Sequence, residues 1–158
     1  MIQRPQTLFF LAGVAICLMM MLSDTVYYTI QNPENAEMYS VEFDETEIIA
    51  NDGKDKLSNT WANVFIGLSA ALSLIAIFLF KNRKTQLLLA SVNYLVIIGI
   101  AIMMYVYSLY MGYFEEKGID GSFTMYAAIP LALVVFNFLA SRGVQRDEKL
   151  IRSMDRLR

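Results

Sequence analysis

The sequence predicts an all-α membrane protein, a four-transmembrane-helix bundle with a small β-containing extracytoplasmic loop and a cytoplasmic amphipathic C-terminal helix. Three observations lead to this class. Of the 158 residues, 56% are hydrophobic and only 18% are charged, whereas soluble domains carry about 25% charged residues. Four apolar segments contain no Asp, Glu, Lys or Arg, and most basic residues lie on one side of them. We expect residues 1–158 to form one domain.

The first segment is uncharged from Leu8 to Leu22, and the residues from Thr25 to Tyr28 extend it. A spanning helix needs about 20 mostly apolar residues. We therefore predict spans at about 7–28, 61–80, 87–114 and 123–140. The third is long enough to tilt or to project beyond the bilayer, and Pro130 should kink the fourth. A soluble bundle is disfavoured, because residues 87–104 have no polar face at helical period.

Orientation follows from the positions of Lys and Arg. Ten of the 13 basic residues lie before the first span, between the second and third, or after the fourth, and three lie elsewhere: Lys54, Lys56 and Lys117. By the positive-inside rule, both termini are cytoplasmic. The loop at 29–60 is then external, and residues 141–158 form a cytoplasmic tail.

The external loop is acidic. Residues 23–60 hold nine Asp or Glu residues against two lysines. Residues 38–43 partly alternate apolar and polar, and a second run, 46–50, precedes Asp52-Gly53, a hairpin signal. This pattern predicts a small β-rich cap. Carboxylates can bind calcium, but the spacing is not that of an EF-hand, and a solvated loop is the favoured interpretation.

Catalytic and cofactor sites have no visible residue set. The chain has no histidine and a single cysteine, Cys17, which argues against zinc, haem and iron–sulfur sites. No Asp, Glu, Lys, Arg or His lies in the four apolar segments, so a proton-coupled pump or voltage sensor is not expected. We predict no catalytic residues, no cofactor, no metal and no enzymatic activity.

The polar residues inside the predicted spans that could matter for packing are uncharged serines and asparagines. Ser69 and Ser73 lie four apart, with Gly67 and Ala71 nearby, which suits close helix contact. Asn93 and Asn137 lie near the cytoplasmic ends of the third and fourth spans, so an antiparallel pair would bring the two amides together. We favour a structural role for these intramembrane polar residues over a substrate site.

The tail has a different character. Its apolar residues recur at helical spacing, and Glu148 and Arg152 form an i,i+4 ion pair in the favourable order. A basic amphipathic helix binds anionic lipid or a protein. Because the apolar stripe is narrow, we expect docking on a partner or on the chain's own helix ends. The predicted docking residues are Arg146, Leu150, Ile151, Arg152, Met154, Arg156 and Leu157.

The sequences at both ends of the chain are similar to those of a known protein family. The opening MIQRPQT and the closing RDEKLIRSMDRLR resemble a Bacteroidota family of small inner-membrane proteins with four predicted spans, classed as a domain of unknown function. Pro5 and Met154 depart from the commoner residues. The resemblance implies a multi-pass protein of the bacterial inner membrane and brings no activity.

Two functions remain open. The first is a non-enzymatic accessory or scaffold subunit of an inner-membrane complex, with protein export or envelope assembly as candidate processes. The alternative is a binder or transporter of small molecules or lipids that uses the bundle core around Asn93, Asn137 and Pro130. The expected partners are membrane lipids and other proteins, and no nucleic acid.

Overall fold

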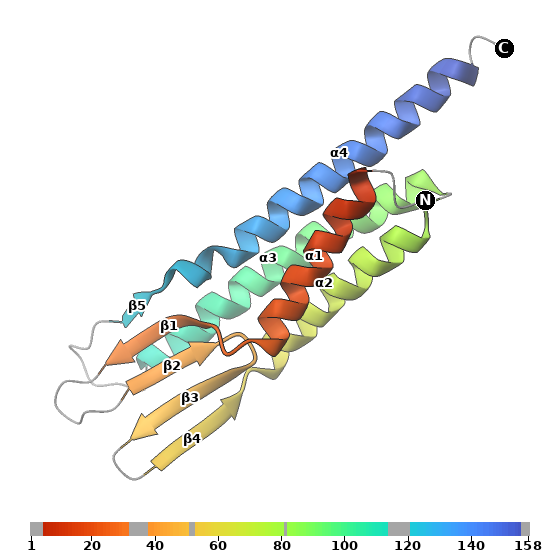
Figure 1. Cartoon of the computed structure of the whole chain (residues 1–158). Helices are drawn as coiled ribbons and strands as arrows, with labels where there is room; N and C mark the ends of the chain where they lie inside the picture. The colour runs from red at the N-terminus through yellow and green to blue at the C-terminus, as the bar shows by residue number, and fades with distance from the viewer. Residues whose placement is uncertain (1–4, 32–37, 51–52, 81, 114–120, 156–158) are drawn as a thin grey trace.

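The computed structural model describes residues 5–31, 38–50, 53–80, 82–113 and 121–155. Figure 1 shows helices side by side and a sheet at one end of them. The elements in chain order are α1 (Pro5–Leu22), β1 (Val26–Gln31), β2 (Met38–Glu42), β3 (Glu45–Ala50), β4 (Gly53–Ser58), α2 (Thr60–Phe78), α3 (Arg83–Tyr113), β5 (Gly121–Phe123), the 3₁₀ helix η1 (Met125–Ala128) and α4 (Ile129–Asp155).

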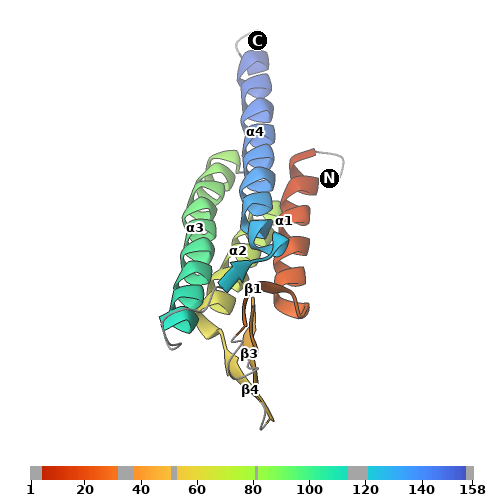
Figure 2. The ribbon, with the colours of Figure 1, turned by 90° about the vertical axis from the view of Figure 1, so that its left-hand side faces the viewer.

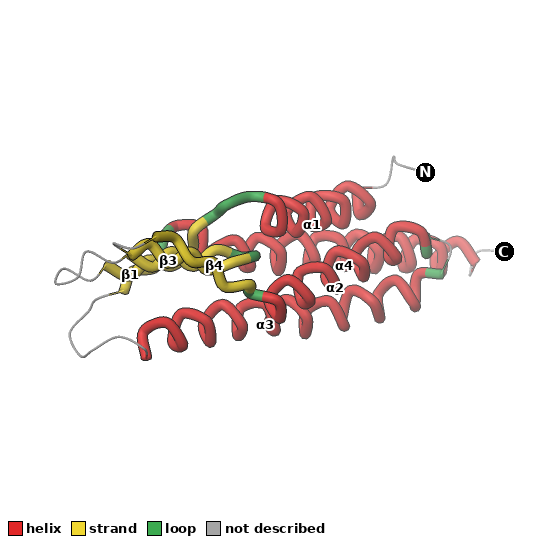
Figure 3. Tube along the Cα trace, turned by 90° about the horizontal axis from the view of Figure 1, so that it is seen from below, coloured by secondary structure: helices red, strands yellow, loops and turns green. Residues whose placement is uncertain are grey.

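The helices pack in a ring of neighbours. α1 packs against α2 and α4, and α3 packs against the same two helices. The start of α1 and the end of α4 lie at the end opposite the sheet, and α4 projects there beyond the other helices (Figure 2). Seen from below, the sheet and the end of α4 mark the two extremes of the molecule (Figure 3).

Within the described residues, three helical stretches are long and apolar enough to cross a membrane: Thr60–Phe78, Arg83–Tyr110 and Met125–Ile151. Their outward side chains are large and apolar, with Phe78 75% exposed and Leu95 70% exposed. Such a surface is costly in water and suits lipid. By length and composition, the chain is therefore a membrane protein.

The predicted fold class is wrong. The chain is not all-α, because a five-stranded antiparallel sheet accompanies the helices, and α1 is shorter than the three candidate spans. The first predicted span ends early, since the helix stops at Leu22 and Val26–Gln31 forms β1. The residues Val26, Tyr27 and Tyr28 are β-branched or aromatic, which favours a strand where partner strands are available.

The fourth predicted span also differs. Its first residues form β5 and η1, and α4 begins only at Ile129. Pro130 is thus in the first turn of α4, where its missing N–H costs nothing, instead of kinking a helix interior. The tail is no separate helix, because α4 continues unbroken to Asp155. The second and third predicted helices are confirmed, with α3 starting four residues earlier, at Arg83.

The sheet has the strand order β4-β3-β2-β1-β5. The predicted hairpin is confirmed, with Ala50 paired to Gly53; residues 51 and 52 lie outside the described residues. β5 joins β1 from far along the chain and pairs Gly121 with Ile30. A Cβ at Gly121 would lie 1.9 Å from the Tyr28 hydroxyl oxygen. No larger residue fits there unless Tyr28 moves.

The sheet and the helices share one hydrophobic core. Tyr27 and Phe43 are fully buried, and their ring centroids lie 5.1 Å apart. The Tyr27 hydroxyl donates a hydrogen bond of 3.4 Å to the backbone oxygen of Met104 in α3. Both residues belong to a cluster that continues through Cys17 and Ile66 into the helices. The sheet is therefore packed onto the helix ends and is not a loose external loop.

Candidate functional site

Asn59, the residue before α2, connects the sheet to α2 by hydrogen bonds. Its side-chain amide donates to the backbone oxygen of Glu42 at 2.8 Å, and its side-chain oxygen accepts from the Thr46 hydroxyl at 3.0 Å. Its backbone N–H donates to Asp44 O, and the Asn63 amide donates to the same oxygen. Asn59 and Thr46 are buried, so these bonds satisfy groups that water cannot reach. The start of α2 and the β2–β3 turn are thus one rigid joint.

The predicted pairing of Asn93 and Asn137 is confirmed. The two residues are 3% and 4% exposed. The Asn93 amide nitrogen donates to the Ser73 hydroxyl at 3.2 Å and lies 3.5 Å from the Asn137 side-chain oxygen. Asn137 donates in turn to the backbone oxygen of Ala90 at 2.9 Å. Three helices, α2, α3 and α4, are linked by this cluster, which has the geometry of helix–helix contact.

The small residues of α2 near this cluster differ in whether they contact another helix. Ser69 and Ser73 are buried on α2, which agrees with the close helix contact predicted from their spacing, and Ser73 accepts a hydrogen bond from Asn93. Gly67 and Ala71 do not make the predicted close contact, because Ala71 is exposed and a Cβ at Gly67 would meet nothing within 4 Å. The helices therefore approach along the serine face of α2 only.

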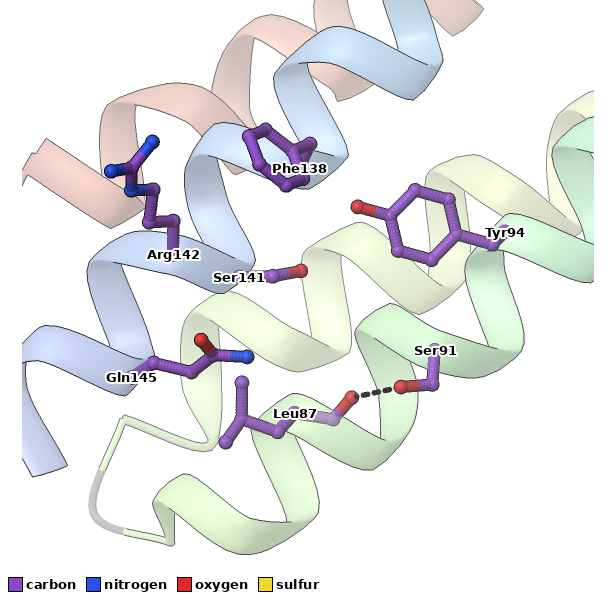
Figure 4. Close-up of a pocket in the computed structure, with 7 residues that line it drawn as sticks. All are labelled: Leu87, Ser91, Tyr94, Phe138, Ser141, Arg142 and Gln145. Carbon is purple, nitrogen blue, oxygen red and sulfur yellow. Dashed lines mark hydrogen bonds between the residues drawn. The ribbon is translucent and has the colours of Figure 1, made fainter.

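A pocket of about 400 Å³ lies between α3 and α4 (Figure 4). It takes Leu87, Ser91 and Tyr94 from α3 and Phe138, Ser141, Arg142 and Gln145 from α4. Asn93, Asn137 and Pro130 do not line it. The place expected for a binding site in the core is thus filled by hydrogen-bonded amides, while the pocket lies beside it.

The pocket carries polar groups of several kinds. The Tyr94 hydroxyl points from α3 toward α4 (Figure 4). The Ser91 and Ser141 hydroxyls donate to the carbonyls of Leu87 and Asn137 in their own helices, so their oxygens are left as acceptors. Arg142 forms no ion pair within the described part of the chain. None of the seven lining residues is acidic.

The predicted docking residues fall at the projecting end of α4. Arg146, Leu150 and Ile151 are exposed, with Leu150 63% and Ile151 36% exposed. The side chains of Arg152 and Met154, and all of Arg156 and Leu157, lie outside the described residues. The described part of this segment does not dock on the chain's own helix ends, because its apolar side chains face outward.

The acidic residues of the sheet form no metal site among the residues described. Glu42 is buried on β2. Burial raises the pKa of its carboxyl above the ordinary value of 4.5, and the negative charges of Asp24, Asp44 and Glu45 raise it further. The carboxyl of Glu45 instead forms an exposed ion pair with Lys56, which contributes little to stability.

Sequence reasoning missed the joint at Asn59 and the pocket. An Asn directly before an apolar helical segment is a recognised N-cap signal, although here its side chain bonds to the β2 and β3 residues and not to its own helix. The pocket had a weaker signal. The first charged residue after the fourth apolar segment is Arg142, and this marks a membrane boundary.

The model of a family described as a domain of unknown function (DUF4293) matches residues 2–157 of the chain. Among curated proteins, no sequence matches it.

Proposed function

Because the chain belongs to the DUF4293 family, whose description assigns no activity, we propose a function from its structure: a non-enzymatic accessory or scaffold subunit of a bacterial inner-membrane complex. The observation that carries this proposal is the projecting end of α4. Leu150 and Ile151 stand exposed on an ordered helix beyond the neighbouring helices. An isolated helix end of this kind gains stability by packing, and a partner protein supplies that packing.

The charge distribution supports the orientation that this function needs. The first turn of α3 holds Arg83 and Lys84, and the second half of α4 holds Arg142, Arg146 and Lys149. Both segments lie toward the end opposite the sheet (Figure 1). The positive-inside rule assigns that end to the cytoplasm. In this orientation both chain ends are cytoplasmic, α4 reaches a cytoplasmic partner, and the acidic sheet faces the other side.

Site-specific crosslinking in native membranes tests the proposal. A photoreactive amino acid at position 150 is expected to give a discrete adduct with one protein. The same amino acid in place of Leu131, which is 67% exposed on the apolar part of α4, is the control that faces lipid. The adduct is expected to disappear when Ile151→Ser is added and to persist with Ser153→Ala. If positions 150 and 131 give the same adducts, α4 has no specific partner and the proposal fails.

The alternative, a binder or transporter that uses the core around Asn93, Asn137 and Pro130, has less support. Both amides are engaged with other helices, and Pro130 is buried at the start of α4. A ligand there would have to replace these hydrogen bonds at a cost of about 1–3 kcal/mol for each group left unpaired.

A further inference from the structure

We propose that the pocket between α3 and α4 binds the phosphate of an anionic phospholipid headgroup, an inference that goes beyond the proposed scaffold function. The first argument is depth. The charge-free part of α4 ends at Ser141, and Arg142 is the first charged residue after it. On α3, Arg83 and Lys84 lie one turn before Leu87. The pocket therefore sits where apolar helix gives way to basic residues, the level at which phospholipid phosphates lie.

The second argument is the set of hydrogen-bond donors. Arg142 supplies a guanidinium that binds phosphate oxygens in pairs. Gln145 supplies an amide N–H₂, and the Tyr94 hydroxyl points into the space between the helices. No carboxylate among the seven lining residues competes for Arg142. Only the bond between Ser91 and Leu87 joins two of the residues drawn in Figure 4.

The third argument distinguishes a lipid from free phosphate. Leu87, which is partly buried and packs against the core, and the half-exposed Phe138 form the apolar part of the wall. A soluble anion makes no use of such a wall, whereas the glycerol and first acyl carbons of a lipid do. The Ser91 and Ser141 oxygens are acceptors for the hydroxyl groups of a glycerol headgroup.

The test is native mass spectrometry of the full chain in detergent with added dioleoyl phosphatidylglycerol. We expect the wild type and Lys149→Gln to retain one phosphatidylglycerol in preference to phosphatidylcholine. Arg142→Gln removes one positive charge, as Lys149→Gln does, but removes it from the pocket. It is expected to weaken the retention of phosphatidylglycerol roughly tenfold, the factor for one charge-assisted hydrogen bond. Tyr94→Phe, which keeps the ring, should weaken it about threefold. Lys149 is exposed on α4 and does not line the pocket, so it is the matched charge control.

Three outcomes would overturn the proposal. Equal losses for Arg142→Gln and Lys149→Gln would mean diffuse attraction between basic residues and lipid. Equal retention of phosphatidylcholine would remove the anionic preference. Full displacement by millimolar inorganic phosphate would identify a soluble anion as the ligand. Thermal unfolding of each variant in the same detergent separates loss of the fold from loss of the site, and Tyr94→Phe tests the pocket where Arg142→Gln fails to fold.

Discussion

The two extremes of the molecule are built in opposite ways. At the sheet end, polar and apolar side chains are used internally: Asn59 joins strands to α2, and Tyr27 is packed against α3. At the other end, α4 leaves its neighbours and carries Leu150 and Ile151 outward. In the described part of the sheet end, the buried Asn59 and Thr46 side chains are paired with each other, although Asp44 Oδ1 and Asn63 Oδ1 have no hydrogen-bond partner. The α4 end instead presents apolar surface that nothing in the described chain covers. This difference indicates that partners are more strongly expected at the α4 end.

Among the polar contacts, the largest effect that we predict is at the sheet joint. Asn59→Ala leaves the buried Thr46 hydroxyl and the Glu42 carbonyl without their partner and should lower the free energy of unfolding by about 3 kcal/mol. Thermal unfolding in detergent, together with hydrogen exchange at β2–β4, measures it. Ser58→Ala, whose exposed hydroxyl bonds only to Thr60, is the control and should change stability by less than about 0.5 kcal/mol. Equal losses in the two variants would mean that the joint is not rigid.

A smaller effect is expected in the middle of the helices. Asn137→Leu removes the bonds to Asn93 and Ala90 and replaces the amide with an apolar side chain of similar size. Hydrogen bonds between membrane helices contribute on average about 0.6 kcal/mol, so the unfolding free energy should fall by about that amount. Unfolding in detergent by steric trapping checks this, with Ser91→Ala as an exposed control. A loss above about 2 kcal/mol would show that the cluster contributes as strongly as the sheet joint.

The pH dependence of the sheet should be smaller still. The pKa of Glu42 is raised in the folded state by burial and by neighbouring carboxylates. The stability that protonated Glu42 contributes to the folded state is therefore fully present below pH 4.5, the ordinary pKa of a Glu carboxyl. It is lost as pH rises through the raised pKa that Glu42 has in the folded state. Hydrogen exchange in β2 should become faster across that window in the wild type. Glu42→Gln should flatten this part of the profile, and an unchanged profile would assign the dependence to other groups.

The smallest effect on stability is expected at the projecting helix end. Leu150→Ser together with Ile151→Ser should change the unfolding free energy of the isolated protein by less than about 0.5 kcal/mol, while preventing co-purification of the partner protein from mild detergent. The same change at Leu133, which is buried on α4, should cost roughly 2–5 kcal/mol. If the double variant destabilises the protein as much as Leu133→Ser, the α4 end packs within the chain and the contrast between the two ends disappears.

Hydropathy was sufficient for part of this fold. It located α2 and α3, and the depth of Asn93 and Asn137 in their segments predicted their contact. It failed at Val26–Tyr28, because a continuous apolar and aromatic run is read equally well as the end of a helix or as a strand. The deciding factor is pairing with β5, almost 100 residues further along the chain, which local patterns do not contain.

The candidate sites also depend on contacts that local sequence patterns do not contain. The exposed positions of Leu150 and Ile151 agree with the helical spacing read from the sequence, but the continuation of α4 without a break was not predicted, since a change from apolar to basic composition suggests a boundary. The pocket depends on Tyr94 of α3 and Arg142 of α4 lining the same space. Neither residue is distinctive on its own segment, and only the packing of α3 on α4 brings them together.

The strand order has a consequence for the sequence of events in biosynthesis. Strands β1 to β4 come from one continuous stretch, Val26–Ser58, whereas β5 is synthesised only after α2 and α3. Neighbouring strands in a meander close early because their contacts are local, so we expect a four-stranded intermediate on a nascent chain that ends before Gly121. The arrival of β5 beside β1 then brings the start of α4 to the existing sheet. The shortest of the described strands is thus the closing step. Purified chains truncated after residue 113 and after residue 140 should differ in the protease resistance of β1.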